Sequence, residues 1–84
     1  MKASAYVFIT TQQGKRVVQE LRELPGIARV DGLFGTPDVI AIVEGDDLRA
    51  IDLAIDRIAE MPEVLGTDSK VVRWIETEPD LERQ

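Results

Sequence analysis

Residues 33–44 of the chain read LFGTPDVIAIVE, a turn that leads directly into five consecutive apolar residues. The letters GTPD at 35–38 are typical of turns, because glycine, proline and aspartate favour the backbone angles that turns need. A strand with one face in water alternates apolar and polar side chains, since successive side chains point to opposite faces of the sheet. Residues 39–43 do not alternate, so this stretch predicts a strand that is covered on both faces.

The rest of the chain contains three more β-rich segments and two with helical spacing of apolar residues. Residues 5–10, AYVFIT, are β-branched and aromatic and also lack alternation, which predicts another strand of this kind. Asp46 stands where the second helix should begin and is expected to cap it. In chain order the predicted elements are a strand (5–10), a helix (15–24), two strands (27–34 and 39–44), a helix (46–60) and a strand (64–75).

This β-α-β-β-α-β order predicts a ferredoxin-like fold of the α+β class. The expected architecture is a four-stranded antiparallel sheet with both helices on one face. In the second strand, Ala28, Val30 and Phe34 are expected to share one face. The expected inner, core-facing stripe of the second helix consists of Leu48, Ile51, Ala54, Ile55 and Ile58.

Two helices cannot cover both faces of such a sheet, and the second face is predicted to be apolar as well. Large exposed apolar patches are rare on monomers and usually mark contacts. Burial stabilises by about 25 cal/mol per Å² of apolar surface, so covering several large side chains is worth many kcal/mol. We therefore predict a homodimer in which two sheets pack face to face. The alternative is that the last strand or the tail folds back over the sheet.

Composition limits the function classes. The 84 residues include no cysteine and no histidine, and the net charge is −6 at pH 7. Histidine is the usual general base near neutral pH and a common metal ligand, so we expect no enzyme, no metal site and no cofactor. An acidic chain repels phosphate backbones, which argues against direct nucleic-acid binding. No apolar run approaches the roughly 20 residues of a membrane span, and a cytoplasmic location is expected.

Two polar segments are candidate binding elements. Residues 35–38 form either a simple hairpin turn, in which Asp38 accepts local N–H groups, or a loop that holds a small polar ligand. Residues 66–69, GTDS, form either a bend in a long strand or one wall of a polar pocket at a subunit boundary. The chain has no phosphate-binding glycine motif and no nucleophile elbow.

These residues resemble the effector-binding domain of the Lrp/AsnC transcriptional regulators over about residues 3–76. The resemblance lies chiefly in LPGI at 24–27, GTPD at 35–38 and MPEVLGTDS at 61–69. Two positions depart from the family pattern: Pro37 stands where Tyr or Phe is usual, and Glu63 where glycine is usual. We expect residues 1–76 to form this domain and residues 77–84 to form an acidic tail that frays.

The resemblance implies a ligand-binding and oligomerisation module. Its dimers would assemble into a larger ring, an octamer or similar, and an amino acid would bind between dimers. The chain resembles stand-alone members that lack the DNA-binding helix-turn-helix, which implies indirect modulation of transcription through full-length Lrp/AsnC regulators as partners. The implied ligand-binding residues are Gly35, Thr36 and Asp38 on one side and Thr67 and Ser69 opposite.

Two other functions remain open from the sequence. One is a small dimeric ferredoxin-like barrel enzyme similar to the monooxygenases, which the lack of histidine and the few aromatic residues disfavour. The other is an ACT-like amino-acid-binding module, which has a similar topology and usually regulates an attached enzyme.

Overall fold

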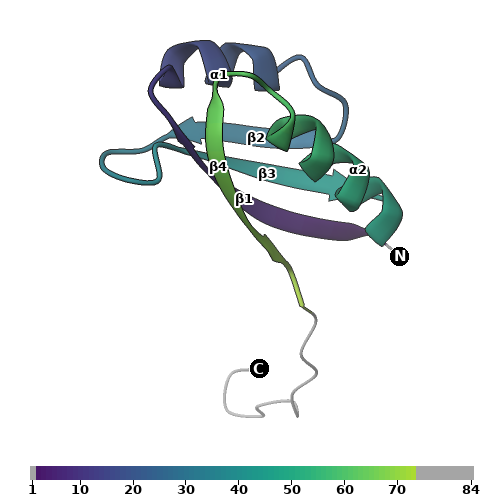
Figure 1. Ribbon diagram of the computed structural model, residues 1–84. Coiled ribbons are helices and arrows are strands. Elements are labelled where there is room, and N and C mark those ends of the chain that lie inside the picture. The colour runs from purple at the N-terminus through teal and green to yellow at the C-terminus, as the bar shows by residue number, and fades with distance from the viewer. Residues whose placement is uncertain (1, 74–84) are drawn as a thin grey trace, which may run out of the picture.

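The computed structural model describes residues 2–73 of the chain (Figure 1). The elements follow the predicted order. They are β1 (Ala3–Thr11), α1 (Gly14–Leu21), β2 (Ile27–Gly32), β3 (Val39–Gly45), α2 (Leu48–Ala59) and β4 (Val64–Val71).

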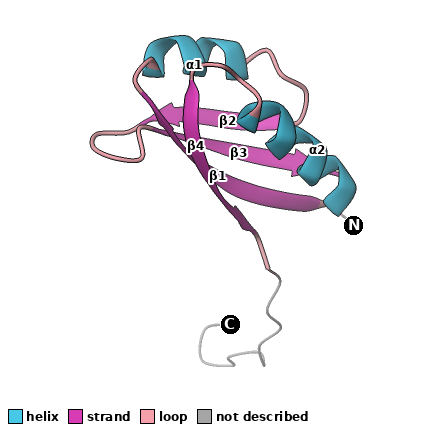
Figure 2. Cartoon of the chain, viewed as in Figure 1, coloured by secondary structure: helices cyan, strands magenta, loops and turns pink. Residues whose placement is uncertain are grey.

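The four strands form one sheet in the order β2-β3-β1-β4, and every neighbouring pair is antiparallel. Both helices lie on the same side of this sheet (Figure 2). This arrangement confirms the predicted ferredoxin-like fold, in which two β-α-β halves interleave their strands.

The apolar run of β3 is explained by the register of the sheet. Its alternate residues Val39, Ala41 and Val43 are buried under the helices, opposite similar residues of β1. The other set, Ile40 and Ile42, lies opposite Phe8 and Tyr6, so these four side chains share the face that carries no helix. The fully buried side chains on the helix side include Val7, Ile9, Val17, Leu21, Val39, Val43, Ile51 and Ile58.

The second strand is shorter than predicted. β2 ends at Gly32, and Phe34 lies in the following loop with its side chain fully exposed. Ala28 is exposed as well, because the register with β3 shifts between Ile27 and Arg29. The prediction that Ala28 and Phe34 share one strand face with Val30 is therefore wrong, and of the three only Val30 is buried.

The cap of the second helix lies one position later than predicted. Asp47, not Asp46, is the N-cap, and its Oδ1 accepts the Ala50 N–H at 2.9 Å. Leu48 is consequently the first helical residue and is 64% exposed, so its predicted place in the core is wrong. Ile51, Ala54 and Ile58 are buried as predicted and Ile55 is partly buried against the core.

The last strand ends earlier than predicted, at Val71, and the Val72 N–H donates to the Ser4 carbonyl at 2.8 Å. β4 therefore runs along the edge of the sheet beside β1 and does not fold over its open face. Residues 74–75 of the predicted strand and the predicted tail, 77–84, lie outside the described residues. No helix in residues 2–73 is long and apolar enough to cross a membrane.

Candidate functional site

The turn between β2 and β3 is held by backbone hydrogen bonds. The Leu33 N–H donates to the Asp38 carbonyl at 2.7 Å, and the Asp38 N–H donates to the Ile9 carbonyl at 2.9 Å. Gly35 has φ +92°, a conformation that side-chain-bearing residues rarely adopt, so a glycine is required at this point of the turn. The turn is thus anchored to β1 as well as to its own strands.

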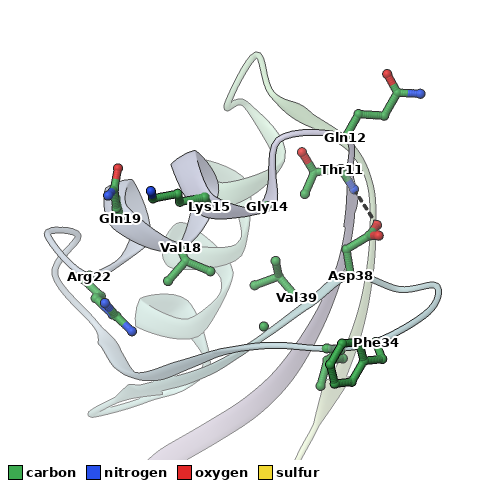
Figure 3. Close-up of a pocket in the computed structure, with 12 residues that line it drawn as sticks. Thr11, Gln12, Gly14, Lys15, Val18, Gln19, Arg22, Phe34, Asp38 and Val39 are labelled. Atoms are coloured by element: carbon green, nitrogen blue, oxygen red, sulfur yellow. Dashed lines mark hydrogen bonds between the residues drawn. The ribbon is translucent and has the colours of Figure 1, made fainter.

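The Asp38 side chain adds a second bond to β1. Its Oδ2 accepts the Thr11 N–H at 2.9 Å, across 27 positions of the chain (Figure 3). This contact differs from the local turn bonds considered for Asp38, because its partner is the last residue of β1. One oxygen of the carboxylate is therefore used to hold the turn against the sheet.

Thr11 joins three segments of the fold. Besides its bond to Asp38, its hydroxyl donates to the Glu63 carbonyl at 2.6 Å and accepts the Gln13 N–H at 2.9 Å. The residue itself is 95% buried, and its three hydrogen bonds are partly buried. Sequence reasoning missed Thr11, because no local pattern marks a residue whose partners are 27 and 52 positions away.

Glu63 lies at the same junction. Its Oε2 is 3.4 Å from Arg16 Nε, while Oε1 is buried without a hydrogen-bond partner among the described residues. Arg16 also contacts Glu20, at 3.2 Å. The junction therefore contains a charged pair beside Thr11, at a position where the resembling family usually has glycine.

A first hollow, which we call the helix-side hollow, opens between α1 and the β2–β3 turn. It has a volume of about 830 Å³. Figure 3 shows the α1 side chains on one side of it and Asp38 and Phe34 on the other. Its lining comprises Thr11, Gln12, Gly14, Lys15, Val18, Gln19, Arg22, Gly32, Leu33, Phe34, Asp38 and Val39.

A second hollow, the sheet-side hollow, includes residues of the face without helices. Its volume is about 440 Å³, and it brings the β2–β3 turn together with the polar part of β4. The lining residues are Phe8, Thr10, Pro37, Gly66, Thr67 and Asp68. The two polar segments singled out in the sequence therefore meet here, although they are about 30 positions apart.

The five predicted ligand-binding residues are distributed over this region. Asp38 lines the helix-side hollow and Thr67 lines the sheet-side hollow, while Gly35, Thr36 and Ser69 line neither. One chain by itself does not gather all five around one cavity. Within residues 2–73, no group of three or more acidic side chains is placed to hold a metal ion.

The comparisons with known proteins agree with this architecture. Residues 4–74 match the family model of the Lrp/AsnC ligand binding domain. A comparison with curated protein sequences finds no match for this chain.

Two solved structures of similar size resemble this one closely. The hypothetical protein PHS023 from Pyrococcus horikoshii is 25% identical, with a TM-score of 0.79, covering 87% of this chain and 92% of that one. FFRP-DM1 is 26% identical, with a TM-score of 0.79, covering 84% of this chain and 99% of that one.

A larger protein shares the fold. It is the transcriptional regulator NMB0573 from Neisseria meningitidis, solved as a complex with L-Met, which is 15% identical with a TM-score of 0.71. The match covers 90% of this chain but only 53% of the regulator, so the present chain spans about half of that protein.

Proposed function

The chain belongs to the Lrp/AsnC ligand-binding domain family, and from that premise we propose that it is a non-catalytic module that senses an amino acid. It would modulate transcription indirectly, through full-length regulators of the family, and work in the cytoplasm. It would assemble as a homodimer and then as a ring of dimers, an octamer or similar. No cofactor is needed for any of these roles.

The observation that carries the proposal is the apolar face of the sheet that has no helix. Tyr6 is 44% exposed there, and Phe8, Ile40 and Ile42 are only partly buried within one chain. A second sheet packed on this face would remove these side chains from water, which stabilises in proportion to the apolar area buried. The face supports a dimer, because apolar patches of this kind usually mark contacts.

The ligand is expected at the β2–β3 turn, close to this interface. Backbone N–H groups of residues 35 and 36 suit an α-carboxylate, and the second oxygen of Asp38 suits an α-ammonium group. The remaining wall of the site would come from a neighbouring dimer, because no one cavity of a single chain contains all five residues. A relative solved with L-Met, NMB0573, supports the choice of an amino acid.

The proposal is tested by a calorimetric screen of the standard amino acids, with the mass of the protein measured by light scattering with and without each binder. We expect at least one binder, and weaker binding in Thr67→Val, which keeps the shape of the side chain but removes its hydroxyl. A variant that lies outside both hollows, Asp46→Ala, should bind as the parent does. A screen without any binder, or an unchanged affinity in Thr67→Val and in Asp38→Asn, would contradict the proposed site.

A further inference from the structure

The helix-side hollow is lined by more positive than negative charge, although the whole chain carries a net charge of −6. Two cationic side chains, Lys15 and Arg22, line it, and Asp38 is the one carboxylate among its lining residues. That carboxylate already accepts the Thr11 N–H at 2.9 Å. The hollow therefore offers a local excess of positive charge on an acidic protein.

Lys15 lies in the first turn of α1, and Arg22 is the C-cap residue that follows the helix. Lys15, Gln19 and Arg22 follow one another at helical spacing, and Val18 lies between them on the same side. With a rise of about 1.5 Å per residue, the backbones of Lys15 and Arg22 are roughly 10 Å apart along the helix. Both cationic residues therefore line the hollow from α1 and its C-cap, with Gln19 between them along the chain.

Neither cation is paired within the part of the chain that the structure describes. The ion pairs there are made by Arg16, Arg29 and Lys70. Lys15 and Arg22 keep their donors available, and a concave site with low-dielectric walls concentrates the field of such charges. Their arrangement favours an anion over a neutral or cationic molecule.

The remaining walls indicate what kind of anion would fit. Val18, Val39 and Leu33 supply apolar surface to the same hollow, and the Gln12 and Gln19 amides supply hydrogen-bonding groups. A ligand with an apolar middle and a negative group at each end matches this pattern. A carboxylate suits both ends, because arginine binds it through two parallel hydrogen bonds and lysine as a point charge.

We propose that the helix-side hollow, where Lys15 and Arg22 face Asp38 and the β2–β3 turn across an apolar wall, binds a small organic dicarboxylate. One carboxylate contacts Lys15 and the other Arg22, and the carbon chain packs on Val18 and Val39. This site goes beyond the proposed amino-acid site, because it uses Lys15 and Arg22 and shares no lining residue with the sheet-side hollow. The shared element is the turn, so occupancy of one site can alter the position of Asp38 at the other.

The test is calorimetric titration of the full chain with glutarate, and with glutaramide as the neutral molecule of the same shape. At about 0.15 M ionic strength, where weak surface attraction is screened, we expect binding of glutarate and none of glutaramide. Lys15→Gln and Arg22→Gln should each weaken glutarate binding by roughly two- to fivefold, the size expected for exposed ion pairs. The double variant should weaken it by the product of the two losses, roughly four- to 25-fold.

The matched control is Arg49→Gln, which removes the same charge from an exposed residue of α2 outside both hollows. It should bind glutarate as the parent does, and circular dichroism should show all variants folded. If Arg49→Gln weakened glutarate binding as much as Lys15→Gln and Arg22→Gln do, the affinity would depend on net charge and not on the hollow. If glutaramide bound as tightly as glutarate, the charge of the ligand would not contribute to binding. Either result overturns the proposal, as does tighter binding of inorganic phosphate than of glutarate.

The two proposals fail separately. Binding of an amino acid with sensitivity to Thr67→Val, but no binding of glutarate, would leave the amino-acid module intact and remove the dicarboxylate site. Binding of glutarate that depends on Lys15 and Arg22, with no amino-acid binder, would support the dicarboxylate site and contradict the amino-acid module.

Discussion

At the scale of single residues, Thr11 holds the candidate site together. Its backbone N–H is bonded to Asp38, and its hydroxyl is bonded to the Glu63 carbonyl and the Gln13 N–H. These bonds connect the β2–β3 turn, the start of α1 and the loop before β4. A buried polar group with all its partners stabilises modestly, but the loss of one partner leaves another group unsatisfied and costs more.

The variant Thr11→Val should therefore lower the free energy of unfolding by about 1–3 kcal/mol, because the Glu63 carbonyl and the Gln13 N–H lose their partner. Thr10→Val is the matched control, since the neighbouring hydroxyl makes no hydrogen bond among the described residues. Urea denaturation at one protein concentration measures the free energy of unfolding of both variants. Equal stability of the two variants would contradict the role assigned to the Thr11 hydroxyl.

At the scale of elements, the junction between β3 and α2 leaves no room for a side chain at Gly45. A Cβ placed on Gly45, the last residue of β3, would lie 2.6 Å from the Cβ of Ala50. Real Cβ atoms do not approach so closely, so the absence of a side chain here allows α2 to pack directly against the end of β3. This contact also sets the place where Asp47 can cap the helix.

Gly45→Ala should consequently lower the free energy of unfolding by about 1–3 kcal/mol, the usual cost of forcing an extra methyl group into a packed site. Gly32→Ala is its control, because a Cβ at the end of β2 would meet nothing within 4 Å. Thermal unfolding followed by circular dichroism compares the two. If Gly45→Ala were as stable as Gly32→Ala, α2 could move to make room for the methyl group. That result would contradict the close packing of α2 on the end of β3.

At the scale of the whole molecule, the two faces of the sheet have different roles. The helix side contains the core, and the other side presents Tyr6, Phe8, Ile40 and Ile42. A chain this small buries a limited share of its surface by itself, so a partner on the open face adds support that its core cannot supply. The proposed dimer follows from this asymmetry between the faces.

Ile40→Glu should convert the assembly to a species near the 9.4 kDa of one chain, because a carboxylate would be buried without a partner between the two sheets. Leu48→Glu makes the same change at an exposed residue on the helix side and should leave the mass unchanged. Light scattering at micromolar concentration measures both. A mass of 9.4 kDa for the parent protein would contradict the dimer. A dimeric Ile40→Glu variant would show that the dimer interface is not on the face that carries Ile40.

The elements were predictable because their signals are local. Periods of two and of 3.6 residues mark strands and helices, and glycine, proline and aspartate mark the turns. The errors occurred at element ends, as at Phe34 and Leu48, where burial depends on whether a neighbouring segment covers the residue. Asp46 and Asp47 are equivalent as caps in sequence, and only the start of α2 distinguishes them.

The candidate site was predictable only in part. The turn at 35–38 and the polar segment at 66–69 were identified from their residue types, and both contribute to the sheet-side hollow through Pro37, Gly66 and Thr67. The helix-side hollow was not foreseen, because Lys15 and Arg22 look like ordinary solvent-facing residues of an amphipathic helix. Their significance depends on which loop lies opposite them.

The sequence by itself determined the order of the elements, the ferredoxin-like topology and the presence of strands that are apolar on both faces, since each depends on patterns within a few residues. The tertiary structure alone decided that Asp38 is bonded to Thr11, that Thr11 also contacts Glu63, and that two hollows lie on either side of one turn. These features join residues 27 and 52 positions apart. Contacts over such separations are set by how helices and strands pack, which no local pattern specifies.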